Sequence, residues 1–175
     1  MEIRPLREAD DRTTFHSGDP DLDRFLVKYA GQNQFRHHIG TTYVAVEDSR
    51  ILGYATVATG HVEADDLPAV LLRKLPCYPL PVLRLARLAV HSMARKRGLG
   101  KELLRHVFLL ALTMSEEYGC VGVVVDAKPD AVDFYTRFGF APLDVVEGQT
   151  ESRPEPTPMF LPLGLIEDAL EPRAR

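Results

Sequence analysis

The spacing of apolar residues predicts a helix early in the chain. Asp19-Pro20 is typical of a helix N-cap followed by proline at the first helical position. Apolar residues then recur at intervals of three and four, which predicts an amphipathic helix that ends at about Arg36. The apolar residues of this helix are Leu22, Phe25, Leu26, Tyr29 and Ala30.

Strand-like segments lie on both sides of this helix. Residues 2–6 suggest a first strand. Residues 42–46 and 51–57 are rich in β-branched, aromatic and other apolar side chains, and the turn residues 48–50 separate them. The pattern therefore predicts a hairpin.

The second half of the chain alternates between strands and helices, after a proline-rich connection from Gly60 to Pro81 with a short helix near Leu71. Continuous apolar runs predict buried strands, and single apolar stripes predict helices that end at Gly119 and Gly139. In chain order these are a strand over 82–90, a helix from 99, a strand over 121–125, a helix over 129–138, and strands over 140–146 and 159–163.

This order of elements predicts the class of fold. Strands that first pair as a hairpin and then alternate with helices favour an α/β (α+β) protein with a mixed sheet. The 175 residues can bury one sizeable core, and no repeat or linker separates two cores. We therefore expect one domain over residues 1–165 and a tail over residues 166–175.

Composition narrows the class of protein further. Apolar residues make up 45% and charged residues 26% of the chain, which is typical of a soluble globular protein. Neither a membrane-length apolar run nor the apolar core of a signal peptide is present, so a cytoplasmic protein is expected. Cys77 and Cys120 are too few for a disulfide framework or a structural zinc site, and no metal site is predicted.

The net charge of −4 hides a strongly basic segment. From Arg73 to Arg105 there are nine basic residues and one acid, Glu102, so this segment carries +8 and the rest of the chain −12. Such a segment is either a solvated basic face or a site for an anionic ligand. A phosphate-binding loop within it would favour the second interpretation.

Arg95-Lys96-Arg97-Gly98-Leu99-Gly100 stands where the strand over 82–90 gives way to a helix. The first turn of a helix offers unpaired N–H groups and a partial positive charge, and glycine lets the backbone approach an anion closely. The spacing fits neither a P-loop nor the dinucleotide-binding fingerprint, which needs a third glycine where Leu103 stands.

Two motifs in this half of the chain resemble those of the GNAT N-acetyltransferase superfamily. Arg95-x-x-Gly98-x-Gly100 after the strand over 87–90 resembles motif A, and the segment 131–140, Ala-Val-Asp-Phe-Tyr-Thr-Arg-Phe-Gly-Phe, resembles motif B. The resemblance implies a GNAT-type mixed, mostly antiparallel central sheet with helices on both faces. It also implies acetyl-CoA as cosubstrate and direct attack of an amine on the thioester.

The resemblance assigns roles to individual residues. Tyr135 would protonate the departing thiolate, as a phenol with a pKa near 10 can. Lys128 stands where many family members have asparagine. Backbone groups of Leu88, Ala89 and Val90 would pair with the pantetheine arm. The pyrophosphate would be held by Arg95, Lys96, Arg97, Gly98, Leu99, Gly100 and Lys101. The general base is not identified; His61, Glu63 and His91 are the polar candidates.

The N-terminal half is similar to a narrower group, the acetyltransferase toxins of bacterial toxin–antitoxin pairs, through residues 15–26, 30–34 and 41–44. That resemblance implies acetylation of the amino group of aminoacyl-tRNA, a ribbon-helix-helix antitoxin as partner, and a homodimer. The tRNA phosphates would then contact Arg36, Arg73, Lys74, Arg84 and Arg87. The acidic net charge is equally suited to an enzyme for a small cationic amine or a protein amine, and a non-catalytic acyl-CoA-binding module is a further alternative.

Overall fold

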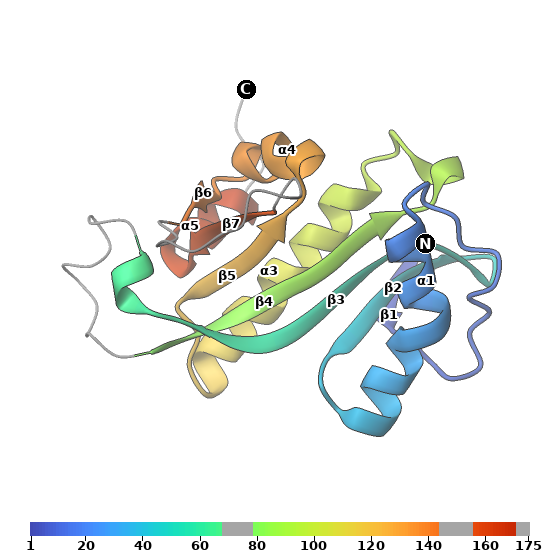
Figure 1. Cartoon of the computed structure of the whole chain (residues 1–175), viewed down its shortest axis with the longest axis horizontal. Helices are drawn as coiled ribbons and strands as arrows, with labels where there is room; N and C mark the ends of the chain where they lie inside the picture. Colours follow the sequence, from blue (N-terminus) through green and yellow to red (C-terminus); the bar gives the residue numbers. More distant parts are fainter. Residues whose placement is uncertain (68–78, 144–155, 171–175) are drawn as a thin grey trace. The chain divides into compact units, whose positions relative to one another are not determined.

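Figure 1 shows the computed structural model of the chain, which describes residues 1–67, 79–143 and 156–170. Seven strands are hydrogen-bonded in the order β1-β2-β3-β4-β5-β7-β6. The strands are β1 (Glu2–Pro5), β2 (Thr41–Glu47), β3 (Arg50–Val62), β4 (Leu80–Val90), β5 (Gly122–Ala127), β6 (Ala141–Pro142) and β7 (Thr157–Pro162). The pairs β1–β2, β2–β3, β5–β7 and β6–β7 are antiparallel, so the mostly antiparallel sheet expected from the sequence is confirmed.

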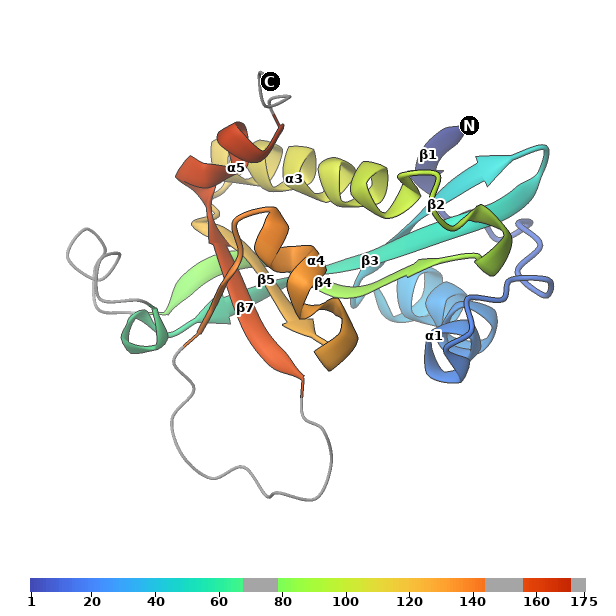
Figure 2. The ribbon, with the colours of Figure 1, turned by 90° about the horizontal axis from the view of Figure 1, so that it is seen from above.

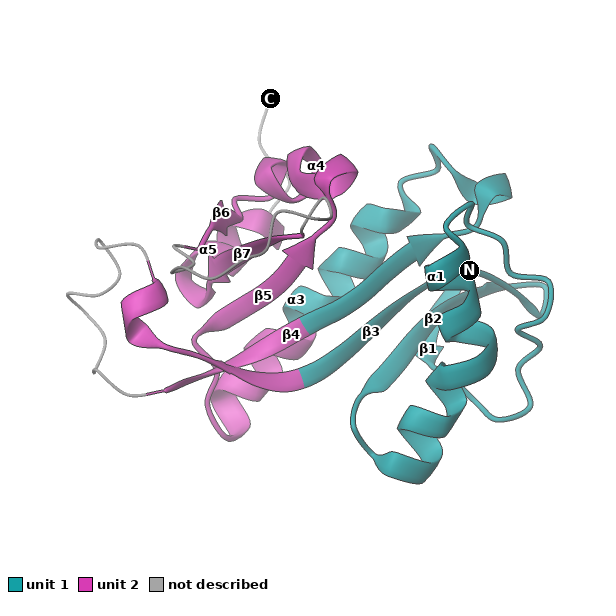
Figure 3. Cartoon of the chain, viewed as in Figure 1, with its two compact units in different colours: residues 1–58, 85–109 teal, residues 59–84, 110–175 magenta. Residues whose placement is uncertain are grey.

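The chain divides into two compact units, shown in Figure 3. Unit 1 comprises residues 1–58 and 85–109, and unit 2 comprises residues 59–84 and 110–175. Both β4 and the long helix α3 (Leu99–Glu117) begin in one unit and end in the other. Gly119 follows α3 with a φ of +107°, and its N–H bonds to the Met114 carbonyl at 2.9 Å, as expected for a glycine past a helix end.

The helix that the apolar spacing predicts lies in unit 1 and follows β1. Asp19 caps α1 (Pro20–Arg24) by accepting hydrogen bonds from the N–H groups of Asp21 and Leu22 at 3.0 and 3.3 Å. The helix then continues as two π-helical segments, η1 (Phe25–Tyr29) and η2 (Gln32–His37), which the sequence did not reveal. In Figure 2 these helical turns and the first turns of α3 lie on opposite faces of the unit 1 strands.

The core of unit 1 gathers around Tyr54 on β3. Its ring is fully buried, meets the edge of Phe15 and stacks on Phe25. Its hydroxyl donates to the Leu22 carbonyl at 2.6 Å, so the helix and the sheet are joined by a polar as well as an apolar contact. The remaining buried members of this cluster are Leu6, Leu26, Ala30, Val44, Ile51 and Ala89.

The predicted hairpin is present, and its second strand is longer than expected. Asp48 and Ser49 both have positive φ, 50° and 63°, which is typical of the type I′ turn that suits the twist of a hairpin. β3 continues to Val62, so residues 60–62 belong to a strand and not to the irregular connection that the prolines suggested. The expected short helix near Leu71 lies outside the described residues.

Unit 2 pairs β5 with β7 along their whole length, from Gly122 opposite Pro162 to Ala127 opposite Thr157. Two expectations are corrected here. Within the described residues, the predicted strand over 140–146 is present as β6, which is two residues long. Residues 163–170 form a helix, α5 (Leu163–Leu170), whose Ile166 is fully buried, so the first half of the segment expected to be a tail, residues 166–170, is helical. Residues 171–175 lie outside the described residues. None of the helices in the described residues is long and apolar enough to span a membrane.

His106 on α3 is expected to make the stability of unit 1 sensitive to pH. Its Nε2 is buried and has no hydrogen-bond partner among the described residues, and its ring lies 4.6 Å from that of Tyr43. Burial lowers the pKa of His106 below its usual value of 6.5, so the folded chain keeps the ring neutral where the unfolded chain protonates it. The unfolded chain then binds more protons, and stability falls as pH drops below about 6.5.

Thermal unfolding at pH 7.5 and pH 5.5 tests this expectation, with His106→Gln as the non-titrating variant. The melting temperature of the wild type should fall more on acidification than that of the variant. Parallel pH profiles for the two proteins would contradict it.

Candidate functional site

The end of β4 leads directly into the basic loop, and both belong to unit 1. Gly53 on the neighbouring strand β3 allows the backbone of β4 and the side chains of α3 to lie close to β3 here. A Cβ at Gly53 would lie 3.1 Å from the Ala89 carbonyl and 3.0 Å from the side chain of Leu103. The first turns of α3 therefore pack tightly against β3 at the point where β3 lies close to the end of β4.

His91 is a structural residue of this loop. It is 6% exposed, its Nδ1 accepts from the Met93 N–H at 3.1 Å, and its Nε2 lies 3.2 Å from the Thr14 carbonyl. The edge-to-face contact with Phe15 holds the ring in the same place. With both ring nitrogens occupied, His91 anchors the loop and is poorly placed to act as a base. His61 and Glu63 are exposed.

The loop itself has the backbone shape of an anion-binding turn. Lys96 and Gly98 flank Arg97 with positive φ, 66° and 75°, and such left-handed residues turn successive N–H groups toward a common side. A Cβ at Gly98 would meet nothing within 4 Å, so open space lies beside the backbone where α3 begins. These features fit a pyrophosphate held by backbone N–H groups at a helix N-terminus.

Two arginines of the loop serve mainly to hold it in place. The Arg95 guanidinium donates to the Ser17 carbonyl, and Arg97 forms an ion pair with Glu47 at 3.0 Å. Gly18 leaves room for Arg95, because a Cβ there would lie 2.8 Å from its Nη2. The role of residues 15–19 in supporting the loop was not predicted, since nothing in a linear sequence shows which carbonyl a distant arginine will reach.

Arg95, Lys96 and Lys101 are exposed and form no ion pair among the described residues, whereas Arg97 is paired with Glu47. The hydrogen bond from Arg95 to a neutral carbonyl leaves its charge in place. The positive charge available to a ligand at the loop therefore comes from these three side chains and the backbone.

Tyr135 belongs to unit 2, on the short helix α4 (Val132–Arg137). Its ring is 5% exposed and meets Phe134 and Phe140 edge to face at 5.2 and 5.4 Å. Burial raises the pKa of Tyr135 well above its usual value of 10. The phenol is therefore protonated throughout the physiological range, which is the state that a proton donor requires.

The arginines predicted to contact an RNA lie in different surroundings. Arg84 pairs with Asp126 at 3.1 Å in unit 2, and Arg87 lies over the Phe25 ring at 3.8 Å in unit 1. Arg36 is exposed on η2. Arg73 and Lys74 lie outside the described residues. The structure thus gathers residues 88–101 in one unit, with Arg36 and Arg87 in that same unit and Arg84 in the other.

Comparison with known proteins agrees with the two motifs. A family model described as an acetyltransferase (GNAT) domain matches residues 38–142. A tRNA-acetylating toxin of Mycobacterium tuberculosis is 36% identical over 138 residues, which cover 78% of this chain and 82% of the relative. Two solved structures are similar over nearly the whole chain. AtaT complexed with acetyl-methionyl-tRNAfMet has a TM-score of 0.82 at 27% identity, covering 97% of this chain and 99% of that one.

A mutant AtaT toxin bound to the C-terminus of the antitoxin AtaR and to acetyl-CoA has a TM-score of 0.75 at 26% identity, covering 95% of each chain. The matched family residues include the hairpin, the basic loop and the segment around Tyr135. The chain therefore belongs to the GNAT acetyltransferase family.

Proposed function

We propose that this chain is a toxin-type N-acetyltransferase that transfers the acetyl group of acetyl-CoA to the amino group of an aminoacyl-tRNA. The observation that carries the proposal is the 36% identity to a tRNA-acetylating toxin across 82% of that protein. The fold similarity to AtaT complexed with acetyl-methionyl-tRNAfMet supports the same acceptor. An acceptor of this kind would place the reaction in the cytoplasm.

Different segments of the chain have different roles in this reaction. The backbone over residues 88–90 would bind the pantetheine arm as an added strand, and the N–H groups of residues 95–101 would hold the pyrophosphate. Acetyl-CoA supplies the acetyl group in activated form. The neutral α-amino group attacks the thioester carbon, so a C–N bond forms and the C–S bond breaks. Tyr135 donates a proton to the departing thiolate, and the proton lost by the attacking amine restores the phenol.

An α-amino group next to an ester is less basic than an ordinary amine, so a neutral fraction is available near pH 7. Such an amine does not require a side-chain base, and His91 is not free to act as one because two hydrogen bonds hold its ring. An antitoxin that covers the site is the partner we propose, by similarity to the AtaT toxin bound to the C-terminus of AtaR.

Transfer of labelled acetyl from acetyl-CoA to a charged tRNA pool tests the proposal. A deacylated pool and a panel of small and protein amines serve as controls. We expect label on charged tRNA alone, and resolution of the labelled species would identify the amino acid. Label on small or protein amines with charged tRNA untouched would overturn the acceptor. Binding of CoA without transfer to any amine would favour a non-catalytic acyl-CoA-binding module.

A further inference from the structure

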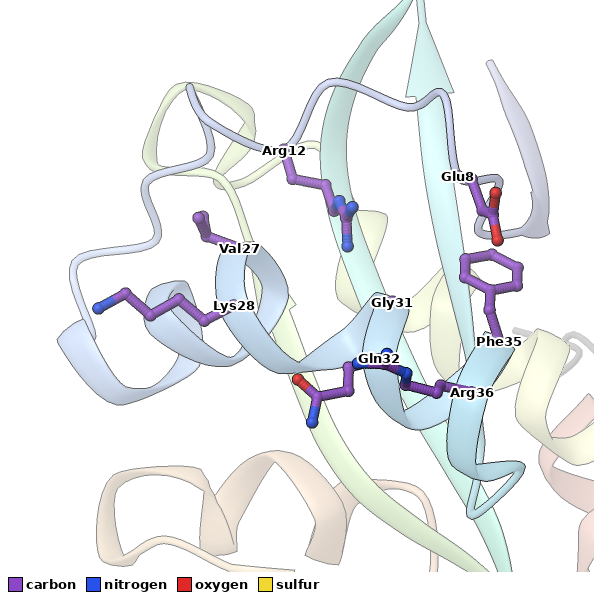
Figure 4. Close-up of a pocket in the computed structure, with 8 residues that line it drawn as sticks. All are labelled: Glu8, Arg12, Val27, Lys28, Gly31, Gln32, Phe35 and Arg36. Carbon is purple, nitrogen blue, oxygen red and sulfur yellow. The ribbon is translucent and has the colours of Figure 1, made fainter.

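A cationic pocket lies on the helical segment of unit 1. It has a volume of about 500 Å³, and none of its residues belongs to the segment 88–101. Figure 4 shows the residues that line it, which come from the segment after β1, from η1 and η2, and from Gly31 between those two helical segments. The lining residues are Glu8, Arg12, Val27, Lys28, Gly31, Gln32, Phe35 and Arg36.

The charge of this pocket is not neutralised by the protein. Three lining residues are cationic, Arg12, Lys28 and Arg36, and one is acidic, Glu8. Within the described part of the chain, none of the three cations forms an ion pair. Arg24, on the same helical stretch, pairs with Asp21 at 3.4 Å. The pocket therefore concentrates positive charge, and an anionic ligand would complete it.

Gly31 lets one of these cations lie against the helix backbone. A Cβ at Gly31 would lie 2.5 Å from Nη1 of Arg12 and 3.3 Å from both Cζ and Nη2 of the same side chain. Gly31 has an ordinary helical φ of −64°, so the backbone does not require glycine there. The bare Cα instead leaves space for the guanidinium, which points toward this turn in Figure 4.

The shape and lining of the pocket favour a phosphate carried by a larger molecule. Its volume lies within the range of about 300–1,000 Å³ that is usual for ligand sites, and is larger than one phosphate needs. Phe35 packs partly against the core and gives the pocket an apolar wall. Guanidinium groups bind phosphate oxygens through two parallel hydrogen bonds, which favours Arg12 and Arg36 as the main contacts.

We propose that this pocket binds a backbone phosphate of the RNA acceptor, through Arg12 and Arg36. This inference rests on the proposed function, because it assigns a contact to the same acceptor. Lys28, which also lines the pocket, points away from Arg12 in Figure 4 and adds to the attraction at longer range.

Binding of deacylated tRNA, measured by fluorescence anisotropy over a range of NaCl concentrations, tests the pocket apart from catalysis. Arg12→Gln and Arg36→Gln should each weaken binding by roughly fivefold at about 0.1 M salt, and should each lower the slope of log affinity against log salt by about 0.7–0.9. Arg24→Gln is the matched control, because Arg24 lies outside the pocket and is already paired. It should change neither quantity appreciably.

Gly31→Ala separates ligand binding from folding. Alanine favours the helix, so the melting temperature should rise or stay the same, whereas the added Cβ displaces the Arg12 guanidinium. We expect weaker tRNA binding of about the size seen for Arg12→Gln. Unchanged affinity in Gly31→Ala and in both arginine variants would overturn the proposal.

The affinity for acetyl-CoA, measured in the same variants, shows whether the pocket binds the RNA or the coenzyme. We expect it to be unchanged, and a loss in the pocket variants alone would overturn the proposal in favour of the coenzyme. A wild-type chain that binds tRNA with the full salt slope but leaves aminoacyl-tRNA unacetylated would support the pocket and overturn the proposed acceptor. A wild-type chain that binds no tRNA would overturn both.

Discussion

Tyr135→Phe is expected to lower kcat by roughly 10²–10⁴-fold, the usual contribution of a general acid, with the affinity for acetyl-CoA retained. The substitution removes the hydroxyl and keeps the ring, so the contacts with Phe134 and Phe140 persist. Without the phenol, the thiolate must leave unprotonated or take its proton from water. Steady-state kinetics with acetyl-CoA and the acceptor, together with direct binding of CoA, measures both quantities.

Tyr118→Phe is a suitable control for this variant. Tyr118 is in the same unit, is 71% exposed and lies just after α3, so loss of its hydroxyl should leave kcat unchanged. Burial raises the pKa of the Tyr135 phenol above its usual value, so the phenol stays protonated between pH 7 and 9. Ionisation of Tyr135 should therefore cause no fall in the wild-type rate over this range. Equal kcat for Tyr135→Phe and the wild type would refute the assigned role.

The parts of the fold that follow from local rules were predicted well. Asp19-Pro20 marked the start of α1, and Gly119 and Gly139 marked the ends of helices, each with a φ near +100°. The failures have tertiary causes. The π-helical turns after Arg24 place Phe25 and Leu26 in the same buried cluster as Tyr54, a contact that no local pattern in the sequence encodes. The helix α5 was missed because prolines and short apolar runs near the C-terminus suggested a loop, strand and tail, whereas burial of Ile166 stabilises a helix there.

The site was predictable in its backbone and less so in its side chains. Glycine spacing after a buried strand indicated the loop over 95–100, because backbone approach to an anion constrains residue type directly. The partners of Arg95 and Arg97 are Ser17 and Glu47, 78 and 50 residues away in the sequence, and no local pattern encodes them. A count of basic residues therefore did not show which of them has an acidic partner, as Arg97 has in Glu47.

Gly98→Ala is expected to weaken the binding of acetyl-CoA by roughly 5–30-fold. At Gly98 the obstacle is conformational and not steric, because φ is +75° and a Cβ would meet nothing within 4 Å. A left-handed conformation costs a residue with a Cβ about 1–2 kcal/mol. If the free loop relaxes to a negative φ, its N–H groups turn away from the pyrophosphate. Binding must then restore the strained conformation, and the full cost appears in Kd.

Gly164→Ala is the matched control, since a Cβ at Gly164 also meets nothing within 4 Å but the residue lies within α5 at an ordinary φ. This variant should be slightly more stable than the wild type and should bind acetyl-CoA equally well. Calorimetric titration with acetyl-CoA and thermal unfolding of both variants show where the cost falls. If the loop cannot relax, the conformational cost of alanine at position 98 lowers the stability of the folded chain and leaves Kd unchanged. The loss of stability and the loss of binding free energy should therefore add up to about 1–2 kcal/mol. If Gly98→Ala matched Gly164→Ala in both, the left-handed turn would have no part in holding the phosphates.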